Sequence, residues 1–138
     1  MLGMSVDVPQ QAAQAYPATA TLATCSSVAP PDAKNAIVVR SIAANLIAGA
    51  AAENRRLVLR DGPSGTGTIL WSMPIWAPAN GAATPIILTD ISIIIPTGGN
   101  VATLEFDGAG AAGSQEGCAM TYLNCGAMID GRSLGRVL

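Results

Sequence analysis

The glycine-rich stretch DGPSGTGT, Asp61–Thr68, has the residue types that most suggest ligand binding. A phosphate-binding P-loop has the pattern G-x-x-x-x-G-K-[ST] and lies between a strand and a helix. Here the lysine is missing, and the TILW that follows is β-branched and aromatic, which favours a second strand. Asp-Gly and Gly-Pro pairs form turns, and Gly65 is free to take a positive φ. The pattern therefore predicts a hairpin tip in which Leu57–Arg60 pairs with Ile69–Trp71.

Four charged residues are candidates for acid–base chemistry. Glu105 and Asp107 lie two apart, on one face of an expected strand, and with Asp90 on a neighbouring strand they could serve a glycosidase. An acidic pair on the outer face of a strand is more typical of a solvated surface. Lys34, the single lysine, is the only candidate base for a serine or cysteine nucleophile, and it sits in a Pro/Asp turn. We therefore expect no catalytic residues and no enzyme activity.

The sequence offers little for metals or cofactors. Histidine is absent, which removes the commonest metal ligand and the commonest general base. The three cysteines, Cys25, Cys118 and Cys125, are a poor zinc site by themselves and make an odd count. The opening MLGMSVDVPQQ has no basic start of the kind that precedes a secretory signal. We predict free thiols in a reducing cytoplasm, with no metal and no cofactor.

The charge content excludes some partners and suggests others. The net charge is −2 and there is no run of lysine and arginine, so we expect no nucleic-acid binding. The apolar runs are too short or too interrupted to span a membrane as a helix. Only 12% of the residues are charged, where about 25% is typical. This composition favours a surface that is buried against neighbouring chains. An unusually apolar monomer remains open.

The spacing of apolar residues predicts an all-β chain. Leu57 and Leu59 should face one way, and Ala102, Leu104 and Phe106 likewise. Pro74 should place its strand at a sheet edge or at a bulge. Seven or eight such strands predict an antiparallel β-sandwich, for which a jelly roll is one possible form. We expect an N-terminal arm at 1–20, the sandwich at 21–126 and a C-terminal tail at 127–138.

The predicted hairpin also carries a resemblance to a known group of proteins. LVLRDGPSGTGTILW resembles a phrase common in small structural proteins of tailed bacteriophages: an apolar strand, RDG, a small-residue turn and G-T-x-L-W. Such proteins often continue as this chain does, with a strand ending near GN (Gly99 and Asn100), then ATLEF and a final strand. The resemblance covers about residues 35–126. It implies a compact β-sandwich that decorates the capsid shell or lies in the tail.

Composition and resemblance together suggest a virion structural protein, a capsid cement or decoration protein that bridges neighbouring shell subunits. We expect it in the virion, assembled in the host cytoplasm, with the major capsid protein or another virion protein as partner. A homo-oligomer, guessed to be a trimer, is expected. A tail or baseplate component stays open, as does a receptor- or carbohydrate-binding module, for which Trp71, Trp76 and Tyr122 could stack on sugars. The expected interface anchors are Trp71, Trp76, Ile93, Ile94 and Ile95, with Arg55, Arg56 and Arg60 as a polar rim.

Overall fold

The chain folds into β-strands joined by turns. The computed structural model describes residues 10–13, 22–30, 32–111 and 113–126, and these contain no helix. Consequently no helix among them is long and apolar enough to cross a membrane. The described strands are β1 (Gln10–Ala13), β2 (Leu22–Val28), β3 (Asn35–Ile47), β4 (Glu53–Asp61), β5 (Thr68–Ala77), β6 (Ala83–Leu88), β7 (Ile93–Ile95), β8 (Ala102–Ala109) and β9 (Gln115–Gly126).

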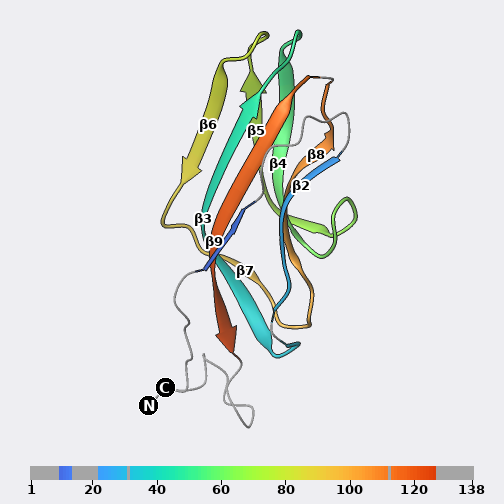
Figure 1. Cartoon of the computed structure of the whole chain (residues 1–138). Helices are drawn as coiled ribbons and strands as arrows, with labels where there is room; N and C mark the ends of the chain where they lie inside the picture. The colour runs from blue at the N-terminus through green and yellow to red at the C-terminus, as the bar shows by residue number, and fades with distance from the viewer. Residues whose placement is uncertain (1–9, 14–21, 31, 112, 127–138) are drawn as a thin grey trace.

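The strands form two antiparallel sheets that pack face to face (Figure 1). Sheet A has the order β1-β9-β3-β6, with β7 also paired to β3, and sheet B has the order β2-β8-β4-β5. The pairs β1·β9, β2·β8, β3·β6 and β4·β5 are nested, as in one long hairpin that is rolled up on itself. That is the strand order of a jelly roll. The predicted β-sandwich is confirmed.

Alternating side chains build the core between the sheets. On β4 and β8 the inward positions include Leu57, Leu59 and Phe106, all fully buried. The two leucines share a face, as the sequence predicted. On β3, Ile37 and Val39 point inward, and a register shift at Arg40 lets Ile42 point inward again. The core is therefore continuous along the long strand β3. Burying each side chain of this size contributes about 1.5–3 kcal/mol.

The strand that faces β3 on its outer side is interrupted. Ile42 pairs with Leu88 on β6, and Val39 pairs with Ile93 on β7. The five-residue advance from Leu88 to Ile93 therefore lies opposite a three-residue advance along β3. The two extra residues form a bend around Asp90, whose φ is 56°. The amide of Ile91 closes this bend by donating to the carbonyl of Arg40 over 3.1 Å. β6 and β7 are thus one strand with a bulge.

Two features were not expected from the sequence. Residues 10–13 fall in the segment assigned to an arm, yet they form β1 and pair with β9 through Ala13 and Ala119 at one end. The rest of the expected arm, and the expected tail at 127–138, lie outside the described residues. The prediction of free thiols is wrong for Cys118, which is disulfide-bonded.

Candidate functional site

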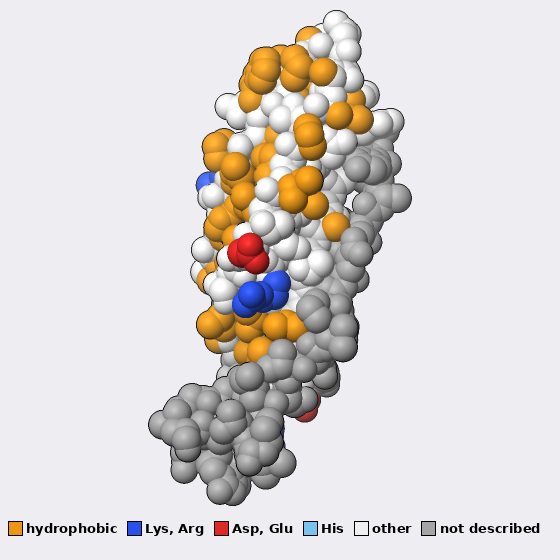
Figure 2. Space-filling view, turned by 90° about the vertical axis from the view of Figure 1, so that its left-hand side faces the viewer, with side chains coloured by type: hydrophobic (Ala, Val, Ile, Leu, Met, Phe, Trp, Pro, Cys, Tyr) orange, Lys and Arg blue, Asp and Glu red, His pale blue; other side chains and the backbone are white. Residues whose placement is uncertain are grey.

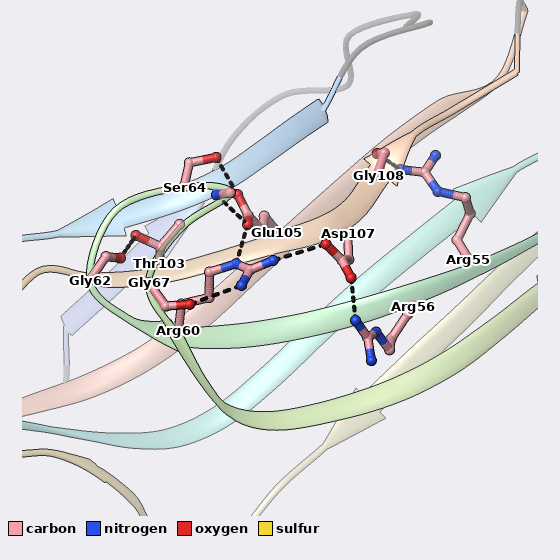
Figure 3. Close-up of polar contacts among 11 residues, drawn as sticks. Arg55, Arg56, Arg60, Gly62, Ser64, Gly67, Thr103, Glu105, Asp107 and Gly108 are labelled. Carbon is pink, nitrogen blue, oxygen red and sulfur yellow. Dashed lines mark hydrogen bonds and ion pairs between the residues drawn. The ribbon is translucent and has the colours of Figure 1, made fainter.

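The glycine-rich loop binds a carboxylate of the same chain, that of Glu105 (Figure 3). β4 and β5 pair as the predicted hairpin, and the loop between them folds back over the outer face of sheet B. There the hydroxyl of Ser64 and the amide of Gly65 both donate to the carboxylate of Glu105, the amide over 3.0 Å. The hydroxyl of Thr103 donates to the carbonyl of Gly62 over 2.8 Å. The loop therefore closes over Glu105 and offers it backbone and hydroxyl donors.

Arg60 completes this enclosure from the neighbouring strand. Its Nε lies 2.5 Å from Oε1 of Glu105, and a second guanidinium nitrogen lies 2.9 Å from Oδ1 of Asp107. Its remaining nitrogen donates to the carbonyl of Gly67 over 2.9 Å. Both Arg60 and Glu105 are buried although they point away from the core, because the loop covers them.

Asp107 is partly exposed and links the buried Arg60 to the exposed Arg56. It also accepts from Arg56, and this hydrogen bond is the main cause that holds the pKa of Asp107 below its usual value. A glycosidase needs one carboxylic acid with a raised pKa, and Asp107 departs in the other direction. Asp90 lies in the β6–β7 bend of the opposite sheet, so the structure does not bring the three candidate acids together.

A second ion pair crosses the interior between the sheets. Arg55 of β4 bonds to Glu116 of β9, donates to the carbonyl of Gly108 over 2.6 Å, and lies 5.6 Å from the ring centre of Phe106. Glu53 accepts from the amide of Ala111 near the same end of the sandwich. Burial is the main cause that lowers the pKa of Arg55. These side chains fix sheet A against sheet B and are not open to a ligand.

The expected interface residues divide into buried and exposed groups. Arg55 and Arg60 are buried in the ion pairs above, and Arg56 alone of the three is exposed. Ile95 is a core residue, while Trp71 and Ile93 are partly buried against the core. Trp76 and Ile94 are each 59% exposed. Of the expected anchors and rim, the exposed residues are therefore Trp76, Ile94 and Arg56.

The exposed large hydrophobic side chains lie on the strands at one edge of the sandwich. β5 ends sheet B and β6 with β7 ends sheet A, and β5 contacts β6 across that side. Figure 2 shows hydrophobic side chains along the length of this side, with an acidic and a basic group next to each other among them. We call the five exposed large hydrophobic residues of β5, β6 and β7 the apolar edge: Ile69, Leu70, Trp76, Ile87 and Ile94.

Ile87 is the most exposed of these residues, at 74%, and was missed in the sequence analysis. The alternation in β6 contains the signal, because Thr84, Ile86 and Leu88 share the inward face and leave Ile87 outward. The neighbouring outer face of sheet A is also poor in charge. There Ala43 pairs with Ile87 and Val38 pairs with Ile94.

Prolines interrupt the backbone of both edge strands. Pro74 lies in β5, which is an edge strand as predicted, and Pro85 lies in β6. A proline cannot donate to a further strand, and such prolines limit pairing between sheet edges. A partner on this side would therefore be bound through side chains rather than by adding a strand.

Other candidate sites are absent from the described part of the chain. No group of three or more histidine, cysteine or acidic side chains there could hold a metal ion. Lys34 is exposed in the turn before β3, where its amide donates to Asp32 over 2.7 Å. Tyr122 is buried in the core cluster, so Trp76 is the one exposed member of the three aromatic candidates.

Comparison with known proteins gives a distant likeness in fold. No family model matches the sequence. No curated protein matches it either. A solved structure that is similar to the fold is the cryo-EM structure of the virus-like particle of extra small virus from the giant freshwater prawn Macrobrachium rosenbergii. The match covers 88% of this chain and 80% of that chain, at 12% identity and a TM-score of 0.28.

Proposed function

We propose that the chain is a virion structural protein, and within that class a capsid cement or decoration protein of the kind found in tailed bacteriophages. The observation that carries the proposal is the apolar edge. Among the described residues, every exposed large hydrophobic side chain lies on β5, β6 or β7. Figure 2 shows hydrophobic side chains along the length of this side, and an exposed apolar strip of this kind marks a contact with another macromolecule. Each copy would use it to bind neighbouring subunits of a shell.

The fold and the composition support this role. Jelly rolls are common in viral capsid and lectin domains, although a fold alone does not assign a function. With 12% charged residues, the chain has few groups to keep this strip solvated. The partners would be the major capsid protein or another virion protein and further copies of the chain. The place of action would be the virion, assembled in the host cytoplasm.

We propose a structural role rather than catalysis, since the two acidic residues that share a strand face are already in ion pairs with arginine. Glu105 and Asp107 are held by arginines on the same face. A carbohydrate-binding module would present a platform of aromatic side chains, whereas only Trp76 of the three candidates is exposed.

The test is the mass of the purified full chain by light scattering at two concentrations. The monomer has a mass of 13.9 kDa. We expect an oligomer whose mass rises with concentration. The double substitution Ile87→Ser with Ile94→Ser should return it to the monomer, because it removes apolar contact area at the edge. Ala52→Ser, at an exposed position in the β3–β4 turn, is the control and should leave the mass unchanged.

Two results would count against the proposal. One is a folded monomer at both concentrations. The other is specific binding on a glycan array that is lost in Trp76→Ala, which would favour the carbohydrate-binding alternative. If the chain does assemble, its copy number in purified particles separates the two virion locations. Hundreds of copies indicate the shell, and tens or fewer indicate the tail or baseplate.

A further inference from the structure

The centre of the β6–β7 side carries one acid and one base that have no partner within the described chain. Arg40 and Asp90 are both exposed, and neither makes an ion pair or a side-chain hydrogen bond to another described residue. They are held near each other because the amide of Ile91 donates to the carbonyl of Arg40. Figure 2 shows the two kinds of charge side by side within the hydrophobic surface.

The residues around this pair are arranged almost symmetrically. Ile87 on β6 lies opposite Ala43, and Ile94 on β7 lies opposite Val38. The two isoleucines therefore lie five positions apart along β3, roughly 16 Å at 3.3 Å per residue. Arg40 lies between those positions. Along this side the order is apolar, charged, apolar in either direction.

We propose that this surface binds the same surface of a second copy of the chain, about a twofold axis that passes beside Arg40 and Asp90. The inference rests on the proposed function and names the contact through which copies meet. A half-turn about that axis sets Ile87 of one copy against Ile94 of the other. It also sets Arg40 of each copy against Asp90 of the other, so both charges gain a partner.

Charge complementarity is what selects a second copy as the occupant. The surface carries one positive group, Arg40, and one negative group, Asp90. To pair both, a partner must place a negative group opposite Arg40 and a positive group opposite Asp90. A twofold copy supplies that arrangement, since residue i contacts residue j and residue j contacts residue i in such an interface. A trimer would need two different surfaces in contact. The prolines of the edge strands leave side chains as the means of contact.

The test is a charge-reversal experiment on the full chain, read out as the dimer dissociation constant by analytical ultracentrifugation. Arg40→Asp and Asp90→Arg each place like charges in contact twice, so each should raise the dissociation constant at least about tenfold. The double variant restores both pairs. A mixture of the two single variants should form a heterodimer with a dissociation constant within about threefold of the wild type. Lys34→Asp makes the same charge change away from this surface and should have no effect.

Asp90 has a positive φ that asparagine tolerates better than arginine does. Asp90→Asn is therefore a second variant, which should weaken the dimer less than Arg40→Asp while keeping the fold. The inference is overturned if the chain self-associates but Arg40→Asp leaves the dissociation constant unchanged. It is also overturned if the mixed variants stay monomeric. Either result leaves the proposed function standing, whereas a wild-type chain that is monomeric at all concentrations contradicts both.

Discussion

Nε of Arg60 lies 2.5 Å from Oε1 of Glu105, on the outer face of sheet B and under the loop of the β4–β5 hairpin. Both groups point away from the core, and both are buried. The loop that resembles a ligand-binding motif is thus occupied by a carboxylate of the same chain. The ion pair and the loop depend on each other, since Ser64 and Gly65 bind Glu105 while Gly67 accepts from Arg60.

Arg60→Met should destabilise the protein strongly. The change leaves Glu105 buried without its opposite charge, and breaking a buried pair in this way costs about 3–5 kcal/mol. The free energy of unfolding would be measured by urea denaturation with tryptophan fluorescence. Arg56→Met is the matched control, because Arg56 is half exposed and its pair with Asp107 should contribute less than about 1 kcal/mol. Equal losses in the two variants would contradict this account.

Gly67→Ala should open the loop. A Cβ at Gly67 would lie 2.8 Å from the carbonyl oxygen of Asp61 and 2.7 Å from the carbonyl carbon of Gly62, both backbone atoms that have little room to move. Overpacking of this kind costs about 1–3 kcal/mol. Hydrogen exchange should show faster exchange of the Gly65 amide, which donates to Glu105. Thr66→Ala, at an exposed position of the same loop, serves as the control. Unchanged protection of that amide in Gly67→Ala would be the contrary result.

Arg56→Gln should raise the pKa of Asp107 towards the ordinary value of 3.8, since the hydrogen bond from Arg56 is the main cause of its lowering. A carboxylate with a lower pKa in the folded state stabilises the fold above its unfolded pKa. That stability is lost as the pH falls through the lowered value. The variant should therefore be less stable than the wild type near neutral pH, and the difference should shrink below about pH 4. NMR titration of the Asp107 carboxyl carbon measures the pKa, and a difference that grows in acid would have the wrong sign.

Arg55 and Glu116 should show strong coupling across the two sheets. Each is buried, and each loses its main partner when the other is replaced. A double-mutant cycle with Arg55→Met and Glu116→Gln should give a coupling of about 0.5–3 kcal/mol, so that the double variant loses less than the sum of the singles. Additive losses would mean that the pair does not link sheet A to sheet B.

Cys118→Ser should lower the unfolding temperature and make it independent of reductant. Cys118 is disulfide-bonded, and removing a disulfide from a small domain typically costs about 2–5 kcal/mol. Dithiothreitol should therefore lower the unfolding temperature of the wild type and leave the variant unaffected. A wild type that ignores the reductant while its disulfide is shown by mass spectrometry to be reduced would contradict the prediction.

The residues that share each strand face could be predicted, because apolar and polar residues alternate along the strands of this chain. Leu57 and Leu59 share one face of β4 as expected, and the Asp61–Thr68 stretch forms the expected turn. The same alternation also predicts the direction of Arg55. Arg55 has the same parity as Leu57, so its place is inside, although it was expected at an interface rim.

The position of the β4–β5 loop over the outer face of sheet B could not be predicted in the same way. Alternation gives the face on which Arg60 and Glu105 lie, but it does not say whether a loop will fold over that face. That depends on contacts between residues about forty positions apart, such as Gly65 with Glu105. The order of the strands, the pairing of β1 with β9 and the disulfide of Cys118 depend equally on long-range contacts.

The nested pairing of the strands has a consequence for how the chain reaches its fold. β4 and β5 are joined by a short loop and can pair first, whereas each outer pair closes a longer loop at a greater entropic cost. Folds dominated by such distant contacts form slowly, in milliseconds to seconds. β9 lies between β1 and β3, so sheet A is incomplete until that strand has been synthesised. A chain still emerging from the ribosome would expose the inner edge of β3, and shielding it until β9 arrives is a task for a chaperone or for rapid translation.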